Sequence, residues 1–252
     1  MPLPSHAKKK DSRMKGVALV TGAGRGLGRI LAAFLSGQGY DMVITARTLS
    51  ELQEVSKSLD GTGVRVVAIS GDITDPVHRT RMLQQTRAMG GLALLVNNAS
   101  ELGEIPRPEL ASASLDRFRL TLETNLVAPI ALIQESLLQL EKTRGLVVNI
   151  SSDASQGGYE RWGIYGSSKA ALDLASKTLA AELRPRHVSI VSVDPGDMRT
   201  RMHQDAYPGE DISDRPLPEV TLPFWAWLVS QDPARITGMR YQAQGTLWEI
   251  PA

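Results

Sequence analysis

From Gly16 onward, the hydrophobic positions follow two alternating patterns, a short continuous apolar run and a longer segment of helical period. Continuous runs of this kind are typical of parallel strands that are buried on both faces. The longer segments carry apolar residues at three- and four-residue spacing, which predicts amphipathic helices. The pattern predicts strands at Val17–Thr21, Met42–Ala46, Val64–Ser70, Ala93–Asn97, Leu146–Ser151, Val188–Val193 and Arg240–Ala243, and helices near 27–37, 51–59, 77–89, 115–140, 164–183 and 219–229.

This alternation predicts repeated β–α–β units, whose right-handed crossovers build an open doubly wound sheet. We therefore expect residues 16–252 to form a single-domain α/β fold of Rossmann type, with a mainly parallel seven-stranded sheet and helices on both faces. Ser50 followed by Gln53 predicts a capping box, and Pro185 predicts the end of the helix that carries Glu182. The stretch 199–218, with three prolines and no clear period, is expected to be a substrate-side loop.

Composition narrows the possible chemistry. The chain has 252 residues, of which 42% are hydrophobic and 22% charged, as in an ordinary folded protein. It contains no cysteine, which excludes disulfide frameworks, thiolate nucleophiles and cysteine-ligated metal centres. The four histidines show neither HxxxH nor HExxH spacing, so we expect no metal site.

Charge is distributed unevenly along the chain. The net charge is +1, but residues 1–15 carry five cations against Asp11, a net +4, which leaves −3 on the remainder. We interpret residues 1–15 as a disordered basic tail, with contact to an anionic surface as the alternative. The remainder lacks the clustered positive charge of a nucleic-acid binder. Because the sequence shows neither a secretory signal nor an apolar membrane span, we expect a cytoplasmic protein without nucleic-acid or membrane partners.

The first predicted strand runs directly into a glycine cluster, Thr21-Gly-Ala-Gly-Arg-Gly-Leu-Gly28, which is followed by an amphipathic helix. Glycines allow a tight turn and a close approach of backbone to ligand, and unpaired N–H groups at a helix start attract phosphate. The turn is therefore a candidate pyrophosphate site. The alternative is a merely flexible connection between strand and helix.

This glycine cluster resembles the TGxxxGxG element of the classical short-chain dehydrogenase/reductase family. Other motifs of that family follow in order along residues 16–245, and their joint occurrence is more specific than any one of them. The sequence departs from the family at Ser100, where the NNAG motif has glycine, and this side chain is expected to narrow the neighbouring pocket. The further motifs are Asp72, Asn97-Asn98-Ala99, Asn125, Ser152, Tyr165-Gly-Ser-Ser-Lys169 and Pro195-Gly196.

The end of the second predicted strand bears on the choice of nicotinamide cofactor. NAD-binding relatives carry an acidic residue there that accepts hydrogen bonds from the adenosine ribose, whereas this chain has Ala46. Arg47, together with Arg25 in the glycine cluster, offers two guanidiniums that can bind a 2′-phosphate. This favours NADP(H), in practice NADPH, as the cofactor. The alternative is that both arginines are solvated surface residues.

The resemblance implies the remaining cofactor contacts. Glycine-turn residues would hold the pyrophosphate, two residues after the third strand would border the adenine, and the segment after the sixth strand would pack along the nicotinamide and bind its carboxamide. The expected cofactor-binding residues are Gly22, Arg25, Gly26, Leu27, Gly28, Arg47, Thr48, Asp72, Ile73, Asn98, Ala99, Tyr165, Lys169, Pro195, Gly196 and Thr200.

Tyr165 and Lys169 stand four residues apart, so a helix places their side chains on one face. A free tyrosine has a pKa near 10, and a nearby ammonium is expected to lower it toward neutral pH. Ser152 is expected to hydrogen-bond the substrate oxygen. The resemblance implies that Lys169 also holds the nicotinamide ribose and that Asn125 supports a water chain, although Asn125 also fits a buried residue that satisfies helix backbone.

Together these residues predict reversible hydride transfer between nicotinamide and a carbonyl or secondary alcohol, with catalysis by Asn125, Ser152, Tyr165 and Lys169. One alternative is a non-catalytic NADP-binding regulator on the same fold. Another is an extended-type epimerase or dehydratase, but those enzymes carry a motif that resembles TGxxGxxG, and their chains are longer.

Two further groups of apolar residues remain. Tyr159 and Trp162 are candidates for a pocket wall, whereas Phe224, Trp225 and Trp227 are interpreted as core or interface. The family's helical interface implies a homodimer or homotetramer, to which Leu122, Leu126, Leu172 and Leu179 offer apolar surface, although some of these leucines must face the sheet instead.

Overall fold

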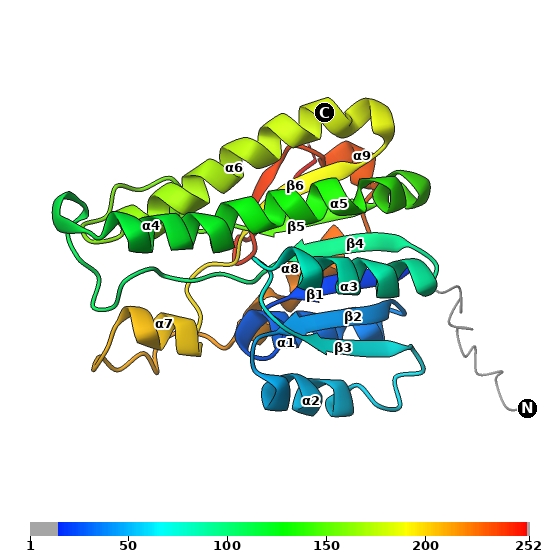
Figure 1. Ribbon diagram of the computed structural model, residues 1–252, viewed down its shortest axis with the longest axis horizontal. Helices are drawn as coiled ribbons and strands as arrows, with labels where there is room; N and C mark the ends of the chain where they lie inside the picture. The colour runs from blue at the N-terminus through cyan, green and yellow to red at the C-terminus, as the bar shows by residue number, and fades with distance from the viewer. Residues whose placement is uncertain (1–14, 251–252) are drawn as a thin grey trace, which may run out of the picture.

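The computed structural model describes residues 15–250, which are built around a seven-stranded parallel sheet (Figure 1). The strand order is β3-β2-β1-β4-β5-β6-β7, and every neighbouring pair is parallel. The order reverses between β1 and β4, which is where a doubly wound sheet opens a crevice for ligands. The expected fold class is confirmed. The strands are β1 (Val17–Thr21), β2 (Asp41–Ala46), β3 (Val66–Ser70), β4 (Leu92–Asn97), β5 (Leu146–Ile150), β6 (Ser189–Asp194) and β7 (Arg240–Gln242), each within two residues of its prediction.

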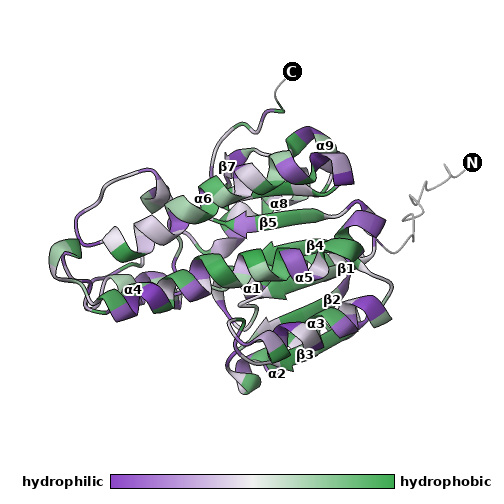
Figure 2. Ribbon diagram, turned by 45° about the horizontal axis from the view of Figure 1, so that its top comes forward, coloured by the Kyte–Doolittle hydropathy of each residue, from purple (hydrophilic) through white to green (hydrophobic). Residues whose placement is uncertain are grey.

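Helices cover both faces of the sheet, whose strands are largely hydrophobic (Figure 2), because alternate strand side chains join the apolar core on each side. On β1, Ala18 and Val20 join one core cluster, whereas Val17 and Leu19 join the other. The first cluster is closed by α1 (Gly26–Gly37), α2 (Leu49–Ser58), α8 (Leu222–Leu228) and α9 (Pro233–Ile236). The second is closed by α3 (Pro76–Ala88), α5 (Ala128–Thr143) and α6 (Gly163–Leu183).

The helix expected over 115–140 is two helices. Helix α4 (Leu115–Leu122) and α5 are joined by a π turn at Glu123–Val127, and Asn125 lies in this turn. A π turn inserts one extra residue into a helix and is frequent at functional sites. Here it lies against α6, so Asn125 is brought to the helix that carries Tyr165 and Lys169.

Two local predictions are corrected. Ser50 is not a helix cap, because the chain enters α2 directly after the turn that follows β2, with Thr48 as N-cap and Ser50 inside the first turn. The stretch 199–218 is not wholly a loop: it contains α7 (Arg201–Ala206), where the Thr200 side chain accepts a hydrogen bond from the His203 N–H. The predicted stop at Pro185 is confirmed, since α6 ends at Leu183.

The expected basic tail lies outside the described residues except for Lys15. Within residues 15–250, none of the helices is both long enough and apolar enough to span a bilayer. The aromatic residues 224, 225 and 227 are confirmed as core: Phe224 and Trp225 are buried, and Trp227 packs against the same cluster.

Candidate functional site

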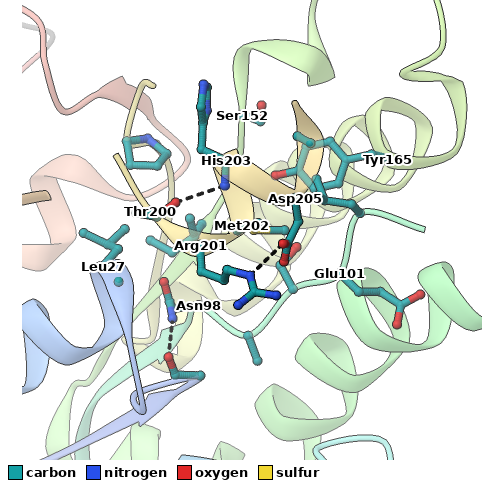
Figure 3. A pocket seen from close by; sticks show the side chains of 18 of the residues that line it. Leu27, Asn98, Glu101, Ser152, Tyr165, Thr200, Arg201, Met202, His203 and Asp205 are labelled. Carbon is teal, nitrogen blue, oxygen red and sulfur yellow. Dashed lines mark hydrogen bonds and ion pairs between the residues drawn. The ribbon is translucent and has the colours of Figure 1, made fainter. Parts of the chain in front are cut away.

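A cavity of about 630 Å³ lies beyond the carboxyl ends of the strands, where segments that follow β1 to β6 converge. Figure 3 shows Leu27 and Asn98 toward one end of this cavity and Tyr165 and Glu101 toward the other, with residues of α7 between them in that view. Of the predicted site residues, only Gly28 and Asn125 are absent from its wall. The cavity is lined by Gly22, Arg25, Gly26, Leu27, Arg47, Thr48, Asp72, Ile73, Asn98, Ala99, Ser152, Tyr165, Lys169, Pro195, Gly196 and Thr200.

The glycine turn requires its glycines for different reasons. Gly22 and Gly26 have φ of +65° and +53°, a backbone conformation that side chains disfavour. A Cβ on Gly28 would lie 2.3 Å from the Gly22 carbonyl oxygen, so α1 packs directly on the turn. Asn98 fixes the turn from β4, since its side-chain amide donates to the carbonyls of Thr21 and Gly22 at 2.9 and 3.1 Å.

The start of α1 is a suitable anion site. Arg25 is its N-cap and makes no side-chain cap hydrogen bond, so no side chain occupies the cap position over the first helical N–H groups. These groups and the helix dipole favour a phosphate. Gly26 lines the cavity, where even a Cβ would lie 3.4 Å from Thr200 Cγ2. The turn therefore fits the pyrophosphate of a dinucleotide.

Residues after β2 and β3 form the outer end of the cavity. Ala46, Arg47 and Arg25 line it as expected, but Arg25 also forms an ion pair of 3.6 Å with Glu51 on α2. The sequence did not predict the ion pair between Arg25 and Glu51, because it does not show that α2 lies beside the glycine turn. Burial raises the pKa of Asp72, but hydrogen bonds from Thr74 and the charge of Arg47 outweigh this and lower it overall.

The Tyr165 and Lys169 side chains lie together on the inner wall of the cavity. Lys169 Nζ is 5.6 Å from the centre of the Tyr165 ring and donates to the Ile150 carbonyl at 2.8 Å. Lys169 is only 2% exposed and Tyr165 9% exposed. Both belong to the first two turns of α6, which the sheet holds against β5 and β6.

Burial dominates the electrostatics of this pair. It lowers the pKa of Lys169 to about 8, against the opposing charge of Asp173. It also raises the pKa of Tyr165 above its usual value, although hydrogen bonds from Ser152 and Ser100 act in the opposite direction. The expectation of a lowered tyrosine pKa is therefore wrong for the free protein, because the loss of hydration of the phenolate outweighs its stabilisation by neighbours.

Ser152 and Ser100 lie beside Tyr165, and Asn125 contacts Ser100. Ser152 caps a short turn after β5 and donates to Asp153 Oδ1 at 3.0 Å, and Ser100 Oγ donates to Asn125 Oδ1 at 3.1 Å. Asn125 is 1% exposed and donates through Nδ2 to the Glu101 carbonyl and to Ser168 Oγ, both at 2.9 Å. The Asn125 side chain thus links the segment after β4 to α6. Neither hypothesis for Asn125, support of a water chain or satisfaction of helix backbone, had included this link.

An aromatic stack that the sequence did not predict lines part of the cavity. The guanidinium of Arg107 lies 3.8 Å from the ring centre of Trp162 and 4.8 Å from that of Tyr207, and the rings of Tyr207 and His203 are 5.0 Å apart. Trp162, Tyr207 and His203 line the cavity, as does Tyr159. The stack joins the segment before α4, the start of α6 and the end of α7, and no spacing rule links residues so distant in sequence.

Comparison with known proteins agrees with this architecture. The family model of the short chain dehydrogenases matches residues 16–211. The L-xylulose reductase of Bos taurus is 32% identical over 201 residues, which are 78% of each chain. The oxidoreductase YciK of Escherichia coli, itself uncharacterised, is 29% identical over 241 residues, or 94% of each chain.

Solved structures give the same result. A short chain dehydrogenase structure from Pseudomonas syringae has a TM-score of 0.85 at 30% identity, covering 91% of this chain and 94% of that one. A second, from Shigella flexneri in complex with NADP, has a TM-score of 0.84 at 28% identity, covering 94% of this chain and all of the other. The chain therefore belongs to the short chain dehydrogenase family of oxidoreductases.

Proposed function

We propose that this protein is an NADP(H)-dependent oxidoreductase that interconverts a carbonyl compound and the corresponding secondary alcohol. The observation that carries the proposal is the convergence of Ser152, Tyr165 and Lys169 on one cavity that continues to the glycine turn. A nicotinamide, when bound there, would supply or accept the hydride. The substrate itself would be a small molecule that enters beside Tyr165.

In the reduction, Tyr165 donates its proton to the carbonyl oxygen as negative charge develops there. The raised pKa of Tyr165 means that the free protein holds this proton at neutral pH, which is the form that reduction needs. Ser152 donates a hydrogen bond to the same oxygen, for which its hydroxyl must turn away from Asp153. Lys169 would hold the cofactor ribose, and Asn125 keeps the segment after β4 against α6.

Support for NADP(H) comes from the outer end of the cavity. Ala46 places no carboxylate where a 2′-phosphate would lie, and Arg25 and Arg47 both line that region. Glu51 competes for Arg25, but this pair is 3.6 Å long and Arg25 is 55% exposed, and such pairs contribute only about 0–1 kcal/mol. A phosphate dianion can therefore draw Arg25 away from Glu51 at little cost.

The direct test is consumption of NADPH and NADH with a panel of ketones, aldehydes and quinones. The native protein should turn over at least one carbonyl compound, with NADPH preferred. Tyr165→Phe should still bind NADPH but lose turnover by ~10²–10⁴-fold, the usual loss for a positioned acid/base group. Tyr40→Phe is the control, because Tyr40 lies outside the cavity wall. Near-native turnover by Tyr165→Phe would contradict the mechanism. If the native protein binds NADPH but turns over no compound of the panel, the alternative of a non-catalytic NADP-binding regulator would be favoured.

We also propose a homodimer or homotetramer, with a correction to the residues expected at its interface. Leu172 is buried within the subunit and Leu179 packs against its core, whereas Leu120 on α4 and Leu174 on α6 are 52% and 67% exposed. An interface over α4 and α6 would cover these leucines. Sedimentation of the native protein at micromolar concentration tests this, and only monomer would count against it. The cytoplasmic location stays a prediction.

A further inference from the structure

A partly buried cation lies directly behind the cavity without forming part of its wall. Arg240, on the edge strand β7, donates through Nε to Asp173 Oδ2 at 3.1 Å and through Nη2 to Asp194 Oδ2 at 3.2 Å. The same Nη2 donates to the Ser152 carbonyl at 2.9 Å. One guanidinium thus joins three segments that are far apart in the sequence.

The two ion pairs are largely shielded from water. The side chains of Asp173 and Asp194 are 6% and 5% exposed, and that of Arg240 is 18% exposed. Arg240 is the cation paired with both carboxylates among the described residues, and Asp173 Oδ1 has no hydrogen-bond partner there. Removing one partner of an ion pair in a shielded site leaves an uncompensated charge. Without Arg240, Asp173 would keep only the hydrogen bond that Ser155 Oγ donates to its Oδ2 at 2.6 Å, and Asp194 would lose its paired cation.

Each contact of Arg240 leads to a different part of the proposed active site. Asp173 is one helical turn after Lys169 on α6. Asp194 accepts a hydrogen bond from the Gly196 N–H at 3.0 Å and so holds the turn after β6. The Ser152 carbonyl begins the short turn after β5, where the Ser155 N–H also donates to it at 3.1 Å.

We propose that Arg240 is a positioning residue that holds Ser152, the Asp194–Gly196 turn and α6 in their relative places around the cavity. The role in catalysis rests on the proposed function, whereas the role in holding the segments does not. The planar guanidinium is needed because two nitrogens at fixed spacing reach three acceptors on different segments, and a lysine offers one nitrogen.

The test uses Arg240→Met, Arg240→Lys and, as control, Arg235→Met, which removes an exposed arginine of α9. Hydrogen exchange of backbone amides, followed by mass spectrometry, measures the placement directly. In both Arg240 variants, exchange should accelerate over 151–157 and 194–197, roughly tenfold or more for Met as expected when a charge-assisted hydrogen bond is lost. The control should leave both segments unchanged.

Kinetics provide the second measurement. Arg240→Met should lower kcat roughly tenfold or more, as after the loss of a charge-assisted hydrogen bond, and kcat should fall by a larger factor than the NADPH Kd rises. The glycine turn, Arg25 and Arg47 lie outside these contacts, so most cofactor binding is retained. Arg240→Lys should recover part of the loss, because it keeps the charge.

The outcomes separate the two proposals. If the native protein turns over no substrate, the proposed function fails, and hydrogen exchange still decides the role of Arg240. Folded variants with native exchange in both segments would overturn the role of Arg240 while leaving the function intact. If Arg240→Met does not fold, Arg240→Lys decides in the same way, and failure of both to fold would show a requirement for folding in place of positioning.

Discussion

The burial of Lys169 predicts that replacing it stabilises the free protein. Its pKa of about 8 in the folded chain, against 10.5 for the free side chain, is a difference of about 2.5 pH units. At about 1.4 kcal/mol per pH unit, the buried charge costs about 3 kcal/mol. Lys169→Met removes this cost but leaves the Ile150 carbonyl without its donor, which costs about 1–3 kcal/mol. At neutral pH the variant should be about 0–2 kcal/mol more stable.

The pH dependence is a sharper signature than the difference at one pH. Below pH 8 the folded and unfolded chains both carry the proton on Lys169, and the full cost is present. Between pH 8 and 10.5 the unfolded chain still holds this proton while the folded chain has released it, so stability rises with pH. From pH 7 to 9.5 the native protein should gain about 2 kcal/mol relative to Lys169→Met.

Urea unfolding at fixed protein concentration, followed by circular dichroism at both pH values, measures this gain. Lys177→Met is the matched control, since it removes an exposed lysine from the same helix and should follow the native protein. If the native protein and Lys169→Met change in parallel between the two pH values, the argument from burial is refuted.

Three further results are expected. Ala46→Asp should weaken NADPH binding roughly tenfold or more by placing a carboxylate near the 2′-phosphate, with NADH less affected; equal or better use of NADH by the native protein would contradict the assignment. Because burial raises the pKa of Tyr165, alcohol oxidation, which needs the phenolate, should accelerate with rising pH while carbonyl reduction does not. Parallel pH profiles in the two directions would oppose this. Ser100→Gly should shift the oxidation profile to higher pH, because it removes the neighbouring hydroxyl that lowers the pKa of Tyr165, and an unshifted profile would show that Ser100 has no such effect.

The sequence was sufficient wherever short-range order determines position. The four-residue spacing of Tyr165 and Lys169 places them on one face of a helix. Ser152 comes directly after a strand, so it lies at the carboxyl ends of the strands, near the same two residues. The glycine turn could be predicted in the same way, because its glycines stand directly between an apolar strand and an amphipathic helix. These features depend on the period of one element or on the parallel sheet, and both can be read from apolar runs.

The remainder depends on contacts between distant segments. Arg240 contacts Ser152, which is 88 residues away in the sequence, and Arg107 packs against residues from two other segments. Contacts of this kind leave no motif in the local sequence, so neither arginine could be predicted as part of the site. The direction of the pKa shift of Tyr165 was predicted wrongly, because the sequence shows the nearby Lys169 charge but not how deeply the tyrosine is buried. The hydrogen bonds that Asn125 makes to protein partners became visible only with the π turn, and its catalytic role stays a prediction.

The nucleotide end of the cavity has consequences for redesign. Position 28 tolerates no side chain, since even a methyl group would overlap the carbonyl oxygen of Gly22 and the amide of Asn98. Arg25 and Arg47, by contrast, are exposed, and substitutions at such positions usually change stability by no more than about 0.5 kcal/mol. The part of the turn that holds any dinucleotide is therefore fixed by packing, while the side chains that would distinguish one dinucleotide from another can be exchanged freely. Cofactor preference in this chain can thus diverge without loss of the fold.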